Sequence, residues 1–253
     1  MKRPGCHLER LRNVTLLIRS GHRHVTALPV AWSAWFVDLL LPRRCVACRG
    51  PASGLCSLCR RSLRPLHPPQ CARCGAPTVW PVERCRECAG RRLAFASATA
   101  AFTYDGPAVA FVRAWKERGL RHLAPLAAEL VTAHVARPAA DVITYIPPDP
   151  VRQLERTRHP AQALAQELAA EWRLEPGSLL RRTRATERQA TLRLAQRRGN
   201  LRDVFMAAQE PPRRVLVVDD VYTSGSTAHA AASALRRAGA ERVDVVTFAR
   251  AIR

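Results

Sequence analysis

Strand-like and helix-like segments alternate along the chain after residue 90. Short apolar runs, rich in β-branched or small and aromatic residues, predict strands at 94–104, 141–146, 215–218 and 242–249. Helical periodicity bounded by turn residues predicts helices at 108–118, 123–136, 161–173 and 228–238. Strands that alternate with helices in this way form a parallel sheet with right-handed crossovers, so the predicted fold class is α/β.

The clearest of these strands leads directly into a loop of small residues. The run 215–218 is entirely apolar, which is typical of a strand buried on both faces. Two acids follow it, and a loop then precedes an Ala-rich helix; the loop reads Thr223-Ser224-Gly225-Ser226-Thr227. Backbone N–H groups at the start of a helix favour a phosphate. No lysine follows the glycine and no G-x-G-x-x-G occurs here, so this is neither a P-loop nor a dinucleotide-binding loop.

The two acids, Asp219 and Asp220, restrict which phosphate compound suits this loop. Paired carboxylates repel a bare phosphate cluster, but they suit the hydroxyl groups of a sugar or a Mg²⁺ ion. We therefore expect a ribose 5-phosphate, with its hydroxyls on the acids and its phosphate on the loop amides. The plainer interpretation is a buried strand followed by a helix-capping loop with Ser226 or Thr223 as the N-cap. Capping alone does not account for adjacent acids at the end of a strand.

A second loop is expected at the same edge of the sheet, because it also follows a strand. It comes after Ile146 and contains Arg152 and Arg156. These arginines could hold a pyrophosphate opposite the ribose, or they could form ordinary solvated surface. Farther along, residues 179–205 carry eight arginines. Such a segment is typical of a cationic flap over a polyphosphate, an Arg-rich linker or a nucleic-acid groove.

Cysteine usage sets the region before the α/β segments apart. Eight of the nine cysteines form four C-x-x-C pairs: Cys45/Cys48, Cys56/Cys59, Cys71/Cys74 and Cys85/Cys88. Each such pair lets two thiolates reach one metal, and Zn²⁺ takes four ligands. The four pairs predict two structural zinc sites. Sequential ribbons are favoured, and an interleaved pairing stays open. A disulfide framework is the alternative, but no secretory signal accompanies it.

Charge and the amino-terminal region add less. The net charge of +21 comes almost wholly from arginine, which is compatible with nucleic acid, with other phosphate-rich partners, or with a genomic bias in base composition.

Residues 1–31 predict a basic, poorly ordered extension, and residues 32–44 predict an amphipathic helix. The apolar stretch 28–41 is interrupted by Ser33 and Asp38, so it falls short of the ~20 residues of a membrane span. We expect no membrane insertion and a cytoplasmic protein.

Several of these features resemble one family. The loop after the acids resembles the PRPP-binding signature of type I phosphoribosyltransferases. The zinc knuckles, the TYIPPD stretch, this loop and a series of spaced residues together resemble the ComF (ComFC-like) family. The spaced residues are Arg184, Thr186, Gln189, Leu192, Arg197, Asn200 and Phe205. The resemblance implies a double zinc ribbon at 45–90 and a phosphoribosyltransferase-like domain at 91–253. One departure is that residues 156–160 read RTRHP, where members often have Arg-Gly-(Phe)-Asn-Gln.

The resemblance implies a protein linked to competence, and two functions follow. In the first, the protein binds PRPP with Mg²⁺ through Asp219, Asp220, the loop 223–227 and Arg152, and it assists the handling of single-stranded DNA for the uptake machinery. In the second, the two acids are catalytic, and the protein transfers ribose 5-phosphate from PRPP to a nitrogen acceptor. A hood that selects a base is not evident, because only Arg250 and its neighbours or the amino-terminal part could form one. This favours the accessory function.

Overall fold

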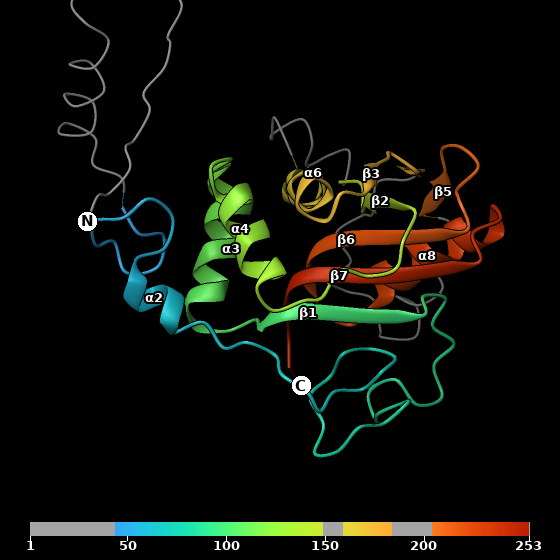
Figure 1. The fold of residues 1–253 in the computed structure, drawn as a ribbon, viewed down its shortest axis with the longest axis horizontal. Helices are drawn as coiled ribbons and strands as arrows, with labels where there is room; N and C mark the ends of the chain where they lie inside the picture. The colour runs from blue at the N-terminus through green and yellow to red at the C-terminus, as the bar shows by residue number, and fades with distance from the viewer. Residues whose placement is uncertain (1–43, 149–158, 184–203, 253) are drawn as a thin grey trace, which may run out of the picture. The chain divides into compact units, whose positions relative to one another are not determined.

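A computed structural model describes residues 44–148, 159–183 and 204–252 (Figure 1). The predicted extension at 1–31 and all of the predicted helix 32–44 except its last residue lie outside the described residues. So do Arg152, Arg156 and most of the arginine-rich segment 179–205. Within the described part of the chain, every helix is too short or too polar to cross a membrane.

A five-stranded parallel sheet forms the centre of the fold and confirms the predicted α/β class. Its order is β1-β7-β6-β2-β3 (Figure 1). The strands are β1 (Ser97–Thr103), β2 (Val142–Tyr145), β3 (Glu175–Pro176), β6 (Arg214–Tyr222) and β7 (Arg242–Arg250). Two long strands, β6 and β7, occupy the middle, where both faces of the sheet are covered. This explains the continuous apolar run 215–218 in β6.

Four helices accompany the sheet, and their ends follow from local sequence. They are α3 (Gly106–Arg118), α4 (Leu123–Thr132), α6 (Pro160–Trp172) and α8 (Ser226–Arg237). A proline stands in the first turn of α3 and of α6, where its missing N–H costs nothing. Gly119 ends α3 in the left-handed region, at φ 62°. The helix predicted at 123–136 ends at Thr132, because residues 133–135 form a turn ahead of Pro138.

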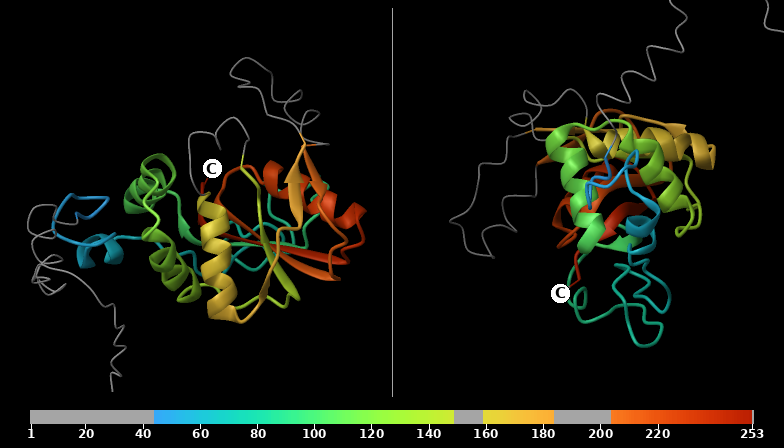
Figure 2. Two further views of the ribbon diagram at one scale, coloured as in Figure 1. Left: turned by 90° about the horizontal axis from the view of Figure 1, so that it is seen from above. Right: turned by 90° about the vertical axis from the view of Figure 1, so that its left-hand side faces the viewer.

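Side chains of β6 alternate between two hydrophobic clusters on the two faces of the sheet. Leu216 and Val218 pack with α3, α4 and α6, whereas Val215 and Val217 pack with α8. Figure 2 shows α6 beside α4, in agreement with the contacts between these helices. Each of the four side chains is at most 1% exposed. Full burial of such a side chain contributes about 1.5–3 kcal/mol, so this strand anchors both layers.

The two cysteine-rich ribbons pack into different clusters. The first, with its short helix α2 (Ser57–Arg61), joins the α3–α4–α6 cluster, and Arg60 forms an ion pair of 2.9 Å with Glu129 of α4. The second joins the α8 cluster and lies against β1: a side chain at Gly75, whose φ is 68°, would collide with the carbonyl oxygen of Ala98. The second ribbon therefore covers part of a sheet face that a helix covers in a simple α/β domain.

A small antiparallel sheet stands beside α8. It pairs β4 (Leu180–Arg182) with β5 (Phe205–Ala207). Leu180 and Phe205 are buried in the α8 cluster, so the two ends of the arginine-rich segment are fixed next to that helix.

Candidate functional site

The two acids lie inside β6, not beyond its end as the apolar run 215–218 suggested. The strand continues to Tyr222, because β7 goes on pairing with it up to Arg250. On the other side, the pairing with β2 stops at Tyr145 and Val218. The four residues after Val218 are therefore bonded on one side only. They form a step at the carboxyl edge of the sheet, where ligands of parallel α/β folds bind.

The regular pairing is interrupted at this step. Paired residues pass from Asp219–Thr247 directly to Val221–Ala249, so Asp220 and its neighbour in β7 are skipped. Side-chain packing shifts as well, since Val221 packs on the same cluster as Val218. The register is the same on both sides of Asp220, so no residue is inserted and the irregularity changes only the directions of the side chains. Sequence periodicity gave no indication of it.

Asp220 is 3% exposed and forms an ion pair with Lys116, whose Nζ lies 2.6 Å from its Oδ1. Lys116 comes from the last turn of α3. Sequence reasoning did not select it as a site residue. The available signal was its rarity, since Lys2 and Lys116 are the only lysines in a chain whose other basic residues are arginine or histidine.

Asp219 is partly buried beside the other acid, and its Oδ1 accepts a hydrogen bond of 2.9 Å from the backbone N–H of Asp220. Burial, followed by the charge of Asp220, raises the pKa of Asp219 to about 7, although Lys116 and Arg182 act in the opposite direction. At neutral pH this carboxyl is near its titration midpoint. A cation or a hydroxyl donor from a ligand would therefore favour its charged form, which is a property of functional carboxylates.

The loop after β6 prepares the start of α8. Gly225 has φ 71°, and a side chain there would collide with the hydroxyl group of Tyr222. Ser224 Oγ donates to Ser226 Oγ at 3.0 Å and accepts from the N–H of Ser226 at 3.3 Å. The N-cap of α8 is Gly225, so the capping alternative with Ser226 or Thr223 as N-cap is wrong. Ser224 Oγ already bonds the first N–H of the helix, and the amides that follow in the first turn are the ones that an anion would bind.

Arg250 joins this loop to the second ribbon. It is 1% exposed at the end of β7, and its guanidinium lies 4.6 Å from the centre of the Tyr222 ring. Nη1 donates to the carbonyl oxygen of Cys74 and Nη2 to Glu87, both at 2.6 Å. Burial is the main reason why the pKa of Tyr222 is raised. Arg250, considered from the sequence as a residue near a base, is thus a buried link between the ribbon and the phosphate loop.

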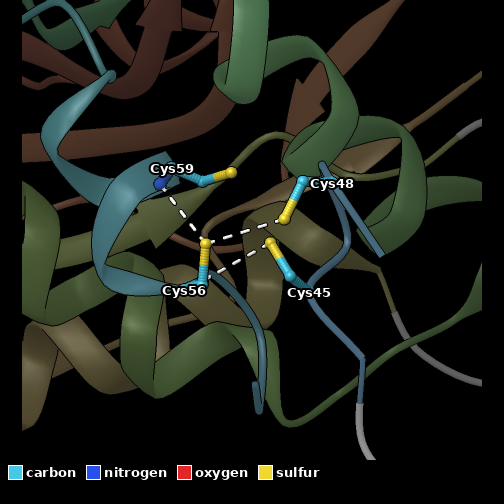
Figure 3. A group of neighbouring side chains, drawn as sticks. All are labelled: Cys45, Cys48, Cys56 and Cys59. Carbon is cyan, nitrogen blue, oxygen red and sulfur yellow. Dashed lines mark hydrogen bonds between the residues drawn. The ribbon is translucent and has the colours of Figure 1, made fainter. Parts of the chain in front are cut away.

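The cysteines form two sequential groups of four, which settles the pairing that the spacings left open. They are Cys45, Cys48, Cys56 and Cys59 (Figure 3), and Cys71, Cys74, Cys85 and Cys88. Sulfur atoms within each group lie within 4.8 Å of one another, with close pairs at 3.7, 3.6 and 3.5 Å. Four thiolates around Zn²⁺ with bonds of about 2.3 Å are about 3.8 Å apart, so both groups match a zinc site.

Backbone N–H groups prepare one thiolate in each cysteine group. The N–H of Cys56 donates to Cys45 Sγ at 3.4 Å, and the N–H of Cys85 donates to Cys71 Sγ at 3.2 Å. Burial opposes ionisation of both thiols, but hydrogen bonds from the backbone outweigh it and lower the pKa of Cys45 to about 6 and that of Cys71 to about 7. Both thiols are therefore largely or partly deprotonated at neutral pH, as metal binding requires.

Comparisons with known proteins agree with both parts. Residues 36–89 match the family model of the double zinc ribbon domain, and residues 158–253 match that of the phosphoribosyl transferase domain. Competence protein F of Haemophilus influenzae is 29% identical over 225 residues, which cover 82% of this chain and 97% of that protein. DNA utilization protein YhgH of Salmonella typhi is 29% identical over 230 residues, or 85% of this chain and 100% of that protein. These relatives and the two family models confirm the resemblance to the ComF family.

Among solved structures, this chain is similar to the glutamine phosphoribosylpyrophosphate amidotransferase from B. subtilis complexed with ADP and GMP. The TM-score is 0.36 and the identity 22%; the match covers 51% of this chain and 26% of that one. The predicted combination of a double zinc ribbon with a phosphoribosyltransferase-like domain is confirmed by the family models and by the paired cysteines. The boundaries drawn at 45–90 and 91–253 stay predictions.

Proposed function

We propose that this protein binds 5-phosphoribosyl pyrophosphate with Mg²⁺ at the carboxyl edge of its sheet and assists the handling of single-stranded DNA in the cytoplasm. One observation carries the first part. Two acids at the step in β6 lie directly before the amino terminus of α8, whose N-cap is a glycine. This arrangement supports a phosphate on the helix amides and hydroxyl groups on the carboxylates.

Each part of the ligand has a matching group. The 5-phosphate would accept hydrogen bonds from the loop amides and from the hydroxyls of Thr223, Ser224, Ser226 and Thr227. Asp219 and Asp220 would accept the ribose hydroxyls, directly or through Mg²⁺. Lys116 balances the charge of Asp220. A Mg²⁺ ion would therefore compensate the charge of the remaining carboxylate, that of Asp219. Arg152, proposed for the pyrophosphate, lies outside the described residues.

Calorimetry with PRPP and Mg²⁺ tests the ribose assignment. Asp219→Asn and Asp220→Asn should each weaken PRPP binding by about 10- to 100-fold, because a hydrogen bond to a charged group contributes about 1.5–3 kcal/mol. Asp141→Asn, the same chemical change at the opposite end of the sheet, is the matched control and should leave the affinity unchanged. Zinc content and melting temperature show whether each variant is folded. If folded Asn variants bind PRPP as tightly as the wild type, the assignment is wrong.

Zinc has a structural function in this proposal. All eight ligand positions belong to cysteines, which leaves no position for a substrate. The two metal sites would hold the ribbons in shape on their separate clusters. Support for the DNA function comes from the names of the relatives, competence protein F and DNA utilization protein, and from the net charge of +21.

A second candidate function is phosphoribosyl transfer to a nitrogen acceptor. The charges of Lys116 and Arg182 both act to lower the pKa of Asp219, which supports this function because cations near the ribose would stabilise a departing pyrophosphate. A screen of pyrophosphate release from PRPP against bases and amines distinguishes the two functions. An acceptor that produces turnover, lost in Asp219→Asn, would establish the enzyme. PRPP binding without turnover for any acceptor supports the accessory function.

A further inference from the structure

The second ribbon exposes apolar surface that its fold does not require. Trp80 is 66% exposed and the adjacent Val79 is 85% exposed, whereas Ala76, a few residues earlier, is 3% exposed. Other large exposed apolar side chains among the described residues are separate from one another in the sequence: Leu58, Met206 and Ile252. A tryptophan left in water forgoes the stabilisation that its large apolar area would give in the core. Trp80 is therefore better placed for a partner than for folding.

A hollow of about 620 Å³ adjoins this tryptophan. It is open to solvent and belongs wholly to the second ribbon. The lining residues are Ala76, Pro77, Thr78, Val79, Trp80, Val82, Arg84, Cys85, Arg86 and Glu87. The indole thus stands at an open concave surface instead of a flat one, and a planar group could be held against it.

The charges on this surface are mainly positive. Arg84 and Arg86 are exposed, and Arg84 is fixed by a hydrogen bond of 3.1 Å from Nη1 to the carbonyl oxygen of Arg91. Within the described ranges, no hydrogen bond or ion pair involves Arg86. The acid in the lining, Glu87, is compensated by Arg250 at 2.6 Å. Two solvent-facing guanidinium groups therefore remain beside an exposed aromatic ring.

We propose that this ribbon-tip surface (Val79, Trp80, Arg84 and Arg86) binds single-stranded DNA, with a base stacked on Trp80 and neighbouring phosphates on the two arginines. The proposal rests on the DNA part of the proposed function and names the surface that performs it. An unpaired base offers a flat face to an indole, and stacking contributes about 1–3 kcal/mol per base. Bases inside a duplex are covered on both faces, so duplex DNA would have only the phosphate contacts.

The position of this surface also connects DNA with the phosphoribosyl site. Glu87 lines the hollow and binds Arg250, which lies against Tyr222 beneath Gly225 of the phosphate loop. The two sites are thus neighbours through one chain of contacts, but they share no residue. A variant at the ribbon tip can therefore be tested for DNA and for PRPP separately.

Fluorescence anisotropy with a labelled oligothymidylate of about 20 nucleotides, longer than the site of one small binding domain, tests the surface on the full-length zinc-loaded protein. Trp80→Ala should weaken binding by about tenfold, and Trp80→Phe should retain much of the affinity. Arg86→Gln should weaken binding by about twofold to fivefold and reduce the slope of log K against log salt by about 1. Leu58→Ala and Arg61→Gln, exposed residues of the first ribbon, are the matched controls and should bind as the wild type does.

Parallel measurements separate the possible failures. Zinc content shows that the Trp80 variants keep a folded ribbon, and calorimetry with PRPP should give the wild-type affinity. A folded Trp80→Ala that binds oligothymidylate as tightly as the wild type overturns the proposal, and so does equal affinity for a matched duplex or tighter binding of RNA. If the wild-type protein does not bind PRPP, the phosphoribosyl assignment is wrong. Trp80-dependent binding of DNA would still support the ribbon-tip surface in that case.

Discussion

The carboxylates at the two ends of the central sheet differ in their ion-pair partners. At the amino end, each acid has an arginine of its own. Asp141 lies opposite Arg214, whose Nε and Nη2 both donate to Oδ1, and Asp244 accepts from Nε and Nη2 of Arg242 at 2.7 and 3.0 Å. The hydrogen bonds from Arg214 lower the pKa of Asp141. These acids are fully paired by the protein itself.

At the carboxyl end, two adjacent acids have one lysine in direct contact. Asp220 pairs with Lys116, while burial and the neighbouring charge raise the pKa of Asp219 to about 7. A pair completed by an arginine contributes to stability, whereas an incomplete one has capacity for a ligand. On this basis we propose that Asp141 and Asp244 serve the structure and that Asp219 and Asp220 serve a ligand, a distinction made by their partners and not by residue type.

The largest expected effect concerns Arg250, which lies at the carboxyl end but donates through both Nη1 and Nη2 to protein groups. Arg250→Met should lower the free energy of unfolding by about 3 kcal/mol, because it leaves Glu87 and the carbonyl of Cys74 without their donor. Urea denaturation measures this, and zinc per chain should also fall as the second cysteine group loosens. If the stability were unchanged, the number of partners that an arginine has would not predict its contribution to the stability of this protein.

Asp244→Asn should produce the next largest effect, about 1–2 kcal/mol of destabilisation. It removes the negative partner of Arg242 and weakens the bond of 2.7 Å from Ser97 Oγ, at an acid that is 5% exposed. PRPP affinity should not change, since the residue lies at the other end of the sheet. Denaturation and calorimetry on one preparation check both expectations. A loss of PRPP affinity without a loss of stability would break the distinction between the two ends.

The smallest expected effect is a pH dependence at Asp219. Its pKa rises from an ordinary 3.8 to about 7 on folding, so the folded state holds the proton more tightly than the unfolded state. This contribution to stability is fully present below about pH 4 and is lost as the pH rises towards 7. Without Mg²⁺ or PRPP, Asp219→Asn should therefore be more stable than the wild type at pH 8 and about equally stable at pH 4. If the variant and the wild type are equally stable at every pH, folding does not raise the pKa of Asp219.

Local sequence was sufficient for the four longer strands, the four main helices and the metal-binding cysteines. The apolar run 215–218 predicted a buried central strand, and the small residues up to Thr227 predicted the turn into α8. The C-x-x-C spacings predicted two metal sites of four cysteines each. These inferences succeed because hydrophobic period, turn residues and metal-knuckle spacing depend on residues a few positions apart.

Only the tertiary structure decided which distant residues complete these sites. It set the sequential pairing of the cysteines, the extension of β6 through both acids, and the gap in strand pairing at Asp220. It also brought Lys116 to Asp220 and Arg250 to Cys74, which are 176 positions apart. Such contacts depend on how helices and ribbons pack on the sheet. Because packing is determined by the summed burial of many side chains, no local pattern in the sequence of this protein records it.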